Sequence, residues 1–360
     1  MGCFHSSANS NRRIQGQRNH PNVGGHQQQS TSEALRSTQS RGVNPEVVVQ
    51  PPSKGVNRDV VHQSSGEIEF NVGGSGNFNV RMFEFKELED ATRRFNSGNH
   101  LGEGGCSYQA TWLLHKAREG EFTAEVETLR QADHPNLIKL VGCCNQREER
   151  ILVYEFMPLG SLEQHLHDLK PDRRALDWST RMKIAAGVAK GLEYLHVTMN
   201  PPVIYRDLKS ANILLGQGYH PKLSDFGLAK EVLEGYEGGQ PCSEPLGTPG
   251  YFAPEYIELG LLTTKSDIFS FGVLLLEIIT GRKAIDDTWP KMDQNLVSWA
   301  QSKFSDPSNF RQMADPVLEG QYLENGLRRA LEIAEMCLHD EPERRPIATD
   351  LVAALDELVS

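Results

Sequence analysis

The sequence predicts an α+β protein with two lobes, in which a small strand-rich unit precedes a larger, mainly helical one. From Phe83 to the C-terminus, apolar segments alternate with turn signals in that order. One helical face is marked by apolar residues at intervals of four, four and three, namely Ile184, Val188, Leu192 and Leu195. Residues 268–279 are apolar on nearly every side. They therefore predict a helix at the centre of the larger lobe, and their length disfavours the alternative of a buried strand.

Residues 1–80 are predicted to be a disordered tether. They are dominated by Ser, Asn, Gln, Gly, Pro and Arg and show no sustained hydrophobic period, so they bury too little apolar surface to fold. Seven basic and three acidic residues within 1–60 give this segment a charge of +4, and since the total is −11, the rest of the chain carries −15. A basic tail beside an acidic domain suits an anionic membrane surface and argues against a nucleic-acid partner.

The first six residues, M-G-C-F-H-S, fit the pattern for myristoylation of Gly2 after removal of the methionine. Cys3 is then placed for palmitoylation, and two acyl chains with nearby arginines would hold the chain on a membrane. We expect the cytoplasmic face of the plasma membrane. The alternative is a chance Met-Gly start in a soluble protein.

The remaining cysteines and apolar runs carry less information. None of the six cysteines forms a C-x-x-C pair or has a histidine at zinc spacing, which indicates a reducing compartment and no structural metal. The longest apolar run, 271–280, is about half of the ~20 residues that a membrane-spanning helix needs. We therefore expect no transmembrane segment and no secretory signal.

Three ordered motifs carry the chemistry: Y-R-D-L-K-S-A-N at 205–212, D-F-G at 225–227 and A-P-E at 253–255. Their order and content resemble the catalytic loop, the magnesium loop and the end of the activation segment of protein kinases. The resemblance runs from about Phe83 to the C-terminus. It implies a kinase domain over 81–360, with an N-lobe at about 95–157 and a C-lobe at about 158–360. It also implies ATP and Mg²⁺ as cofactors and proteins as substrates.

Phosphoryl transfer needs a group that orients the attacking hydroxyl and cations that neutralise the triphosphate. By match to the motifs, Asp207 would be the base, Lys209 would steady the transferring phosphate, and Asn212 with Asp225 would hold magnesium. Any one of these carboxylates alone could instead be a helix cap or turn residue. Tyr205 stands where most kinases have histidine, a position that packs against the Phe226 position in the family.

The activation segment resembles that of serine/threonine kinases, because Lys209 follows Asp207 by two places and Thr248 lies in G-T-P-G-Y. Arg206 can pair with a phosphate on this segment, and Ser243 and Thr248 are the candidate acceptors. Ser243 is the preferred regulatory site, so its replacement by alanine is expected to lower activity without unfolding the protein. The alternative is that Arg206 pairs with a nearby carboxylate.

Residues 151–157, I-L-V-Y-E-F-M, predict a buried strand that leads into the connector between the lobes. In the family, the backbone from Glu155 to Met157 would meet the adenine ring, with Tyr154 at the gate behind it. This tyrosine, the 83–95 lead-in and the M-G-C start resemble plant receptor-like cytoplasmic kinases, relatives of the animal interleukin-receptor-associated kinases. The resemblance implies an upstream membrane receptor kinase. It also implies a buried ion pair between Glu255 and Arg345.

The N-lobe departs from the family pattern and is expected to be truncated by comparison with it. The loop at 101–109 keeps Gly102 and Gly104, but serine and glutamine replace the third glycine and the valine of the pattern. No V-A-I-K strand is present, and 105–121 is short for two strands. Glu125 lies on one helical face with Phe122, Val126 and Leu129 and needs a cation. Either Lys116 substitutes for the missing lysine or the chain is a variant without it, and Lys116 could also be a solvated surface residue.

Two functions follow from these observations. An active serine/threonine kinase is favoured by the complete set of Asp207, Lys209, Asn212 and Asp225. A catalytically impaired scaffold that binds partners is favoured by the missing lysine strand. A small-molecule kinase of similar fold fits poorly with an activation segment as complete as 225–255, and we set it aside.

Overall fold

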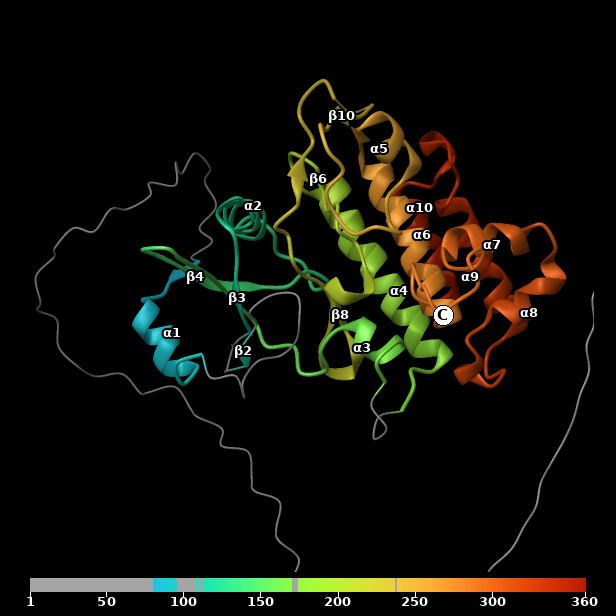
Figure 1. The fold of residues 1–360 in the computed structure, drawn as a ribbon, viewed down its shortest axis with the longest axis horizontal. Coiled ribbons are helices and arrows are strands. Elements are labelled where there is room, and N and C mark those ends of the chain that lie inside the picture. Colours follow the sequence, from blue (N-terminus) through green and yellow to red (C-terminus); the bar gives the residue numbers. More distant parts are fainter. Residues whose placement is uncertain (1–79, 96–107, 110–112, 170–173, 237) are drawn as a thin grey trace, which may run out of the picture. The chain divides into compact units, whose positions relative to one another are not determined.

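The computed structural model describes residues 80–95, 108–109, 113–169, 174–236 and 238–360, with only the backbone at 108–109. Within this part, a strand-bearing N-lobe leads into a helical C-lobe (Figure 1), so the predicted α+β class with two lobes is confirmed. The predicted tether up to residue 79, with Gly2 and Cys3, and the loop glycines Gly102 and Gly104 lie outside the described residues.

The N-lobe is built on a five-stranded sheet in the order β1-β4-β5-β3-β2. Its elements are β1 (Arg81–Met82), α1 (Phe85–Ala91), β2 (Tyr108–Gln109), β3 (Leu113–Lys116), α2 (Glu119–Leu129), β4 (Leu140–Gln146) and β5 (Glu149–Tyr154). β1 runs parallel to β4, while the other neighbours are antiparallel. The sheet therefore begins at Arg81, ahead of the N-lobe start expected at about 95. Two strands fit between residues 105 and 121, against expectation, because β2 has two residues and β3 four.

The two faces of this sheet pack against different helices, because successive side chains of a strand point to opposite sides. Leu114 and Val153 are buried in one cluster with Leu88 of α1. Leu152 and Tyr154 are buried in the main core together with apolar residues of α2. The predicted helical face of α2 is confirmed, since its buried residues are Phe122, Glu125, Val126, Thr128 and Leu129.

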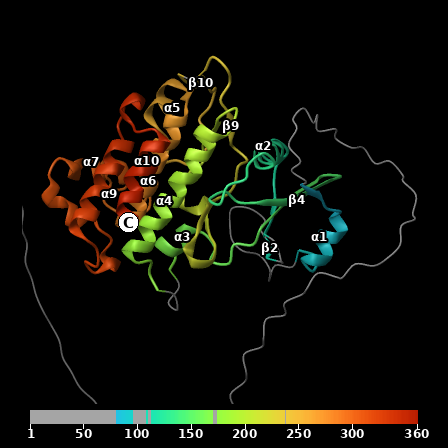
Figure 2. The same ribbon diagram turned by 180° about the vertical axis from the view of Figure 1, so that it is seen from behind.

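The C-lobe is a set of helices around α6 (Figure 2). Its helices are α3 (Leu162–Leu166), α4 (Trp178–Glu193), α5 (Pro254–Leu259), α6 (Thr264–Thr280), α7 (Leu296–Phe304), α8 (Phe310–Met313), α9 (Glu324–Cys337) and α10 (Ala348–Val359). Every residue from Ser266 to Thr280 is buried, which confirms a central helix. Thr263 caps it by accepting a hydrogen bond from the backbone N–H of Lys265, and Gly281 ends it at a φ of 67°.

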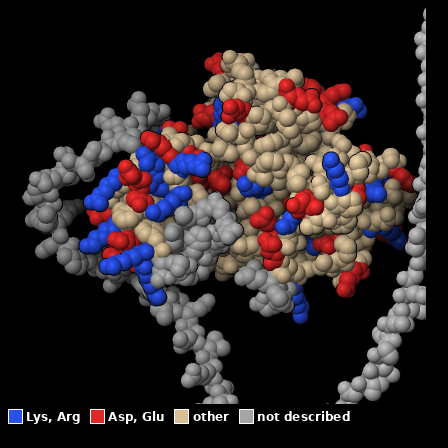
Figure 3. All heavy atoms as spheres, in the orientation of Figure 1, with Lys and Arg blue, Asp and Glu red and all other residues tan. Residues whose placement is uncertain are grey.

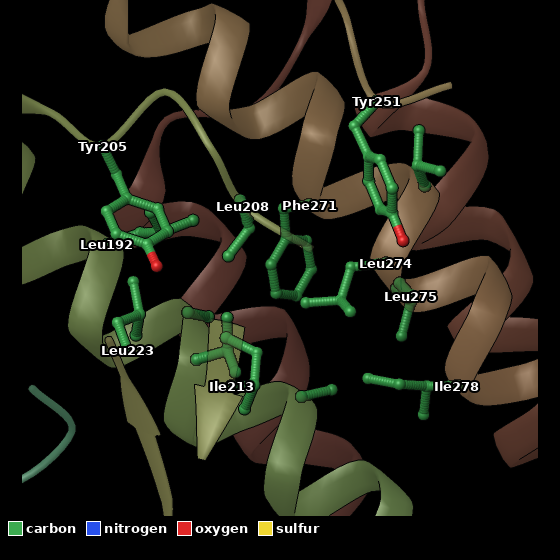
Figure 4. Close-up of a cluster of buried hydrophobic side chains, with 14 of the residues drawn as sticks. Leu192, Tyr205, Leu208, Ile213, Leu223, Tyr251, Phe271, Leu274, Leu275 and Ile278 are labelled. Atoms are coloured by element: carbon green, nitrogen blue, oxygen red, sulfur yellow. The ribbon is translucent and has the colours of Figure 1, made fainter. Parts of the chain in front are cut away.

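The catalytic-loop region lies directly on this core. Leu192 of α4 is buried beside the ring of Tyr205, and Leu208 lies between that ring and Phe271 of α6 (Figure 4). The face of α4 predicted from the sequence is fully buried, which confirms that prediction. Since α4 and α6 are the scaffold under residues 205–208, their packing determines where that loop sits.

Three short two-stranded ribbons carry the loops of the C-lobe. They are β6 (Val203–Ile204) with β9 (Lys230–Glu231), β7 (Ile213–Leu215) with β8 (Pro221–Leu223), and β10 (Gln240–Pro241) with β11 (Leu261–Leu262).

The ion pair predicted for the C-lobe is confirmed. Arg345 donates from Nη1 and Nη2 to the two carboxylate oxygens of Glu255 at 2.9 and 2.7 Å. Among the described helices, none is both long and apolar enough to cross a bilayer.

Candidate active site

The loop that carries Asp207 is anchored to α6 by a buried carboxylate. Asp267 accepts hydrogen bonds from the backbone N–H groups of Tyr205 and Arg206, each at 2.7 Å, and its Oδ2 lies 2.8 Å from Nε2 of His196. These bonds hold Arg206 at a φ of 76°, a region that costs a non-glycine residue free energy. Asp267 was not singled out from the sequence, although a carboxylate at the start of an apolar helix is a visible signal of such a role.

Asp207 has both carboxylate oxygens oriented by donors. Oδ1 accepts from the Thr248 hydroxyl at 2.6 Å, while Oδ2 accepts from Lys209 Nζ at 2.8 Å and from Asn212 Nδ2 at 3.0 Å. Lys209 also donates to the Thr248 hydroxyl at 2.9 Å. Asp207 is only 7% exposed. A carboxylate fixed in this way can accept the proton of one oriented hydroxyl group.

Asn212 and Asp225 are brought together by the β7–β8 ribbon, in which Ile213 lies opposite Leu223. Ser224, which follows β8, donates from its backbone N–H and its hydroxyl to the Asn212 carbonyl at 3.0 and 2.9 Å. The pair that the sequence predicted as magnesium ligands therefore lies at one end of this ribbon. Burial and the charge of Asp207 raise the pKa of Asp225, so this carboxylate would gain from a bound cation.

The residues present fit a magnesium ion. The Asn212 amide nitrogen donates to Asp207, so its side-chain oxygen is the atom that would meet a cation beside the Asp225 carboxylate. Mg²⁺ prefers such oxygen ligands and commonly takes one or two from the protein, with the rest from phosphate and water. In the described ranges, no cluster of three or more His, Cys, Asp or Glu side chains could hold a metal ion by itself. A magnesium ion bound by Asn212, Asp225 and the phosphates of ATP does not need such a cluster.

The D-F-G turn packs on both lobes. The rings of Tyr205 and Phe226 have centroids 5.0 Å apart, which confirms the aromatic contact predicted for the unusual tyrosine, and the tyrosine hydroxyl donates to the Ser224 carbonyl. On the other side, a Cβ atom added to Gly227 would lie 2.9 Å from Cβ of Glu121 on α2. Glycine at 227 thus permits the turn to approach the helix that carries Glu125.

Glu125 is buried at 1% exposure and faces the D-F-G turn. Hydrogen bonding from the Tyr154 hydroxyl and the Phe226 backbone N–H favours its ionised form, but burial outweighs them and raises its pKa to about 8. Its Oε1 atom has no hydrogen-bond partner among the described residues. Glu125 therefore lacks the cation that the sequence analysis expected for it.

Lys116 does not supply that cation. Its Nζ lies 2.7 Å from Oε2 of Glu149 and 5.0 Å from the centroid of the Phe95 ring, on the face of the sheet that α1 covers. Glu125 packs on the other face. The physical reason is the alternation of side chains along β3, which sends adjacent residues to opposite sides. The arrangement favours the alternative reading of Lys116 as a surface residue.

The connector at 155–157 follows β5 directly. The Glu155 carboxylate accepts from the Lys139 backbone N–H at 2.8 Å and pairs with Lys222 Nζ at 2.9 Å. Because its side chain is engaged in these bonds, Glu155 would meet an adenine ring through its main chain. Met157, at the far end of the connector, is buried and belongs to the main core.

The two candidate phosphorylation sites differ in environment. Ser243 is exposed, whereas the Thr248 hydroxyl is bonded to Asp207 and Lys209. The Arg206 guanidinium bonds the Tyr256 hydroxyl through Nε at 2.8 Å and forms no ion pair with a described carboxylate. The sequence alternative in which Arg206 pairs with a nearby carboxylate therefore has no support in the described part of the chain.

Comparison with known proteins decides the family. The model of the protein kinase domain family matches residues 113–354. The probable serine/threonine-protein kinase PBL5 of Arabidopsis thaliana is 46% identical over 386 positions, covering 100% of this chain and 90% of the relative. This chain belongs to the plant receptor-like cytoplasmic kinases. The serine/threonine-protein kinase PBS1 of the same plant is 50% identical over 302 positions, covering 80% of this kinase and 66% of the relative.

The comparisons also show how much of the relative and of the family model this kinase matches. The match to PBL5 extends over 386 positions, while the kinase has 360 residues, so at least 386 − 360 = 26 positions of the relative have no counterpart here. The family match begins at Leu113, the first residue of β3. The matched part thus contains Glu125 and the whole C-lobe set, while the glycine loop precedes it.

Proposed function

We propose that the chain is an active serine/threonine kinase that transfers the γ-phosphate of ATP to hydroxyl groups of proteins at the cytoplasmic face of the plasma membrane. The observation that carries the proposal is the geometry at Asp207. Its two oxygens are fixed by Thr248, Lys209 and Asn212, at distances of 2.6 to 3.0 Å. Positioning and charge stabilisation account for most of the rate of phosphoryl transfer, and this arrangement supports both.

Each residue of the set has a separate part. Asp207 orients the attacking serine or threonine hydroxyl and accepts its proton. Lys209, which bonds both Asp207 and Thr248, steadies the charge that develops on the transferring group. Magnesium-bound ATP would supply the phosphoryl group, with Asn212 and Asp225 as the ligands of the ion.

The test is phosphate transfer by the purified full-length chain with ATP and magnesium, using casein as a generic acceptor. Phosphoserine and phosphothreonine are expected, with incorporation at least about 100-fold lower in Asp225→Asn, because that variant loses a charged ligand. Equal incorporation by the Asp225→Asn variant would refute the assignment.

The scaffold function remains the second candidate because one observation favours it. Glu125 has no cationic partner among the described residues, and Lys116 lies on the other face of the sheet. A scaffold would bind its partners with no phosphate incorporated by either the unchanged chain or the Asp225→Asn variant.

Ser243 is the proposed regulatory site. It is exposed on the activation segment, whereas Thr248 is bonded within the catalytic set. A phosphate on Ser243 would draw Arg206, whose guanidinium is held only by a neutral tyrosine hydroxyl and ring in the described structure. The kinase that adds this phosphate is proposed to be an upstream membrane receptor kinase.

Membrane anchoring through Gly2 and Cys3 completes the proposal. A single myristoyl chain binds membranes only marginally, so both acyl groups are needed for stable attachment. In cells, Gly2→Ala should move the protein from the membrane pellet to the soluble fraction, and Cys3→Ser should move part of it. Retention of the Gly2→Ala protein in the pellet would refute lipid anchoring, and Ser7→Ala is a matched control outside the motif.

A further inference from the structure

The alternation of side chains along β3 points to His115, a residue that was not predicted from the sequence. Leu114 packs in the cluster under α1, and Lys116, two residues on, lies over Phe95 on that same side. Leu113 packs instead against the main core that α2 and β5 share. Since side chains alternate along a strand, His115 lies on the same side as Leu113.

The pairing of β3 with β5 gives the same result independently. Leu113 lies opposite Tyr154 and His115 lies opposite Leu152, and both of these β5 residues belong to the main core. Directly opposite residues of an antiparallel pair share a face. His115 therefore lies on the face that carries Tyr154, whose hydroxyl hydrogen-bonds the buried Glu125.

His115 is also close enough to the magnesium-site carboxylate to act on it. The two side chains lie within range of a direct electrostatic interaction. On β3, all of whose residues are described, His115 is the one side chain on this face that can carry a positive charge. It thus lies on the side of the sheet that holds both Glu125 and Asp225.

We propose that His115 takes the place of the missing N-lobe lysine and binds the phosphates of ATP. Its carboxylate partner would be Oε1 of Glu125, which has no hydrogen-bond partner among the described residues. The inference rests on the proposed function in taking ATP as the ligand. In the kinase pattern, a lysine on the strand before the glutamate helix pairs with the phosphates and with that glutamate. Here His115 stands on that strand, before the helix that carries Glu125.

An imidazole can perform this role in either protonation state. Its neutral form has one N–H donor for a phosphate oxygen, and its charged form has two donors, one for phosphate and one for Glu125. The side chain is shorter than that of lysine and its donors have fixed directions, so the contact should be weaker than a lysine contact. His115→Lys is therefore expected to retain or improve ATP binding.

The experiment is titration calorimetry of the full-length chain with ATP and magnesium. His115→Gln, which keeps a polar side chain of similar length, should weaken binding by about tenfold, the loss expected for one charge-assisted hydrogen bond. His115→Lys should restore it. His220→Gln, which replaces an exposed histidine bonded to the Pro135 carbonyl, is the matched control and should bind as the unchanged chain does.

The outcomes separate this inference from the proposed function. The inference about His115 would be overturned if His115→Gln bound ATP as tightly as the unchanged chain, or if Lys116→Met lost ATP affinity instead. This result would hold whether or not the chain transfers phosphate. If the unchanged chain binds ATP but transfers no phosphate, the proposed function fails. The role of His115 is then decided by the ATP affinities of the His115 variants alone. If the unchanged chain binds no ATP, His115 does not bind the phosphates and the inference is refuted, even if His115→Lys gains binding.

Discussion

Glu125 is a carboxylate almost completely removed from water. Full burial removes solvent from its carboxylate, and Asp225 adds a second negative charge nearby, so its pKa rises to about 8. A raised pKa means that the folded state binds the proton more tightly than the unfolded state, whose glutamate titrates near its ordinary value of 4.5. The stabilising contribution of Glu125 is therefore complete below pH 4.5 and is lost as the pH rises toward 8.

Replacing Glu125 by glutamine should remove this pH dependence. The variant should gain stability relative to the unchanged chain as the pH rises from 5 to 8, by up to about 1.4 kcal/mol per pH unit. Thermal unfolding of both proteins across this range measures the difference in melting temperature. A difference that does not grow with pH would show that Glu125 is ionised in the folded protein throughout the range.

The residues of the site differ in how far the sequence could predict them. Asp207, Asn212 and Asp225 belong to short contiguous motifs. These motifs can be recognised from the sequence without knowing how the side chains pack. His115 depends on which side of a four-residue strand it occupies, and that strand has too few residues to show a period. The side on which Lys116 lies could not be predicted for the same reason, because a shift of one residue moves a side chain to the other face.

At the scale of elements, helices with strong apolar patterns were predicted well. α6 is buried along almost its whole length, and its hydrophobic run is longer than a typical strand. The short strands β2 and β3 were missed because β3 pairs with β5, which lies far along the chain, and β2 pairs in turn with β3. The start of the sheet at Arg81 was missed similarly, since β1 is defined by its contact with β4.

The Glu255–Arg345 pair joins α5 to the segment before α10 and supports a prediction at this scale. Arg345→Ala would leave the buried Glu255 carboxylate without its cation, at a cost of about 3–5 kcal/mol in the free energy of unfolding. Chemical denaturation measures this cost. The neighbouring Arg344 is exposed, so Arg344→Ala is the matched control and should change stability by less than about 0.5 kcal/mol. Equal effects of the two variants would contradict the structural role of the pair.

Across the described part of the molecule, the two lobes depart from the family pattern to different degrees. The C-lobe keeps every motif, and its core holds the catalytic loop through Asp267. The N-lobe has short strands, and β3, with the sequence L-L-H-K, lacks the V-A-I-K pattern. On the face shown in Figure 3, lysine and arginine side chains of the N-lobe lie among acidic ones. Within the N-lobe, Arg81 forms an ion pair with Glu87, and Lys116 forms one with Glu149.

Catalytic activity therefore depends on both lobes. An intact C-lobe set can transfer phosphate only if the N-lobe holds the nucleotide well enough to present it. Positioning and charge supply most of the rate of phosphoryl transfer, and Asp207 and Asp225 are placed to provide both, so we expect a working enzyme.

The most direct measurement is autophosphorylation of the purified full-length chain with ATP and magnesium, beside Asp207→Asn. That substitution keeps the size of the side chain and its contact with Thr248 but removes the proton acceptor. We expect phosphate incorporation by the unchanged chain and at least about 100-fold less in the Asp207→Asn variant, with ATP affinity retained. Equal incorporation in both, or none in either, would contradict the claim that Asp207 serves a working kinase.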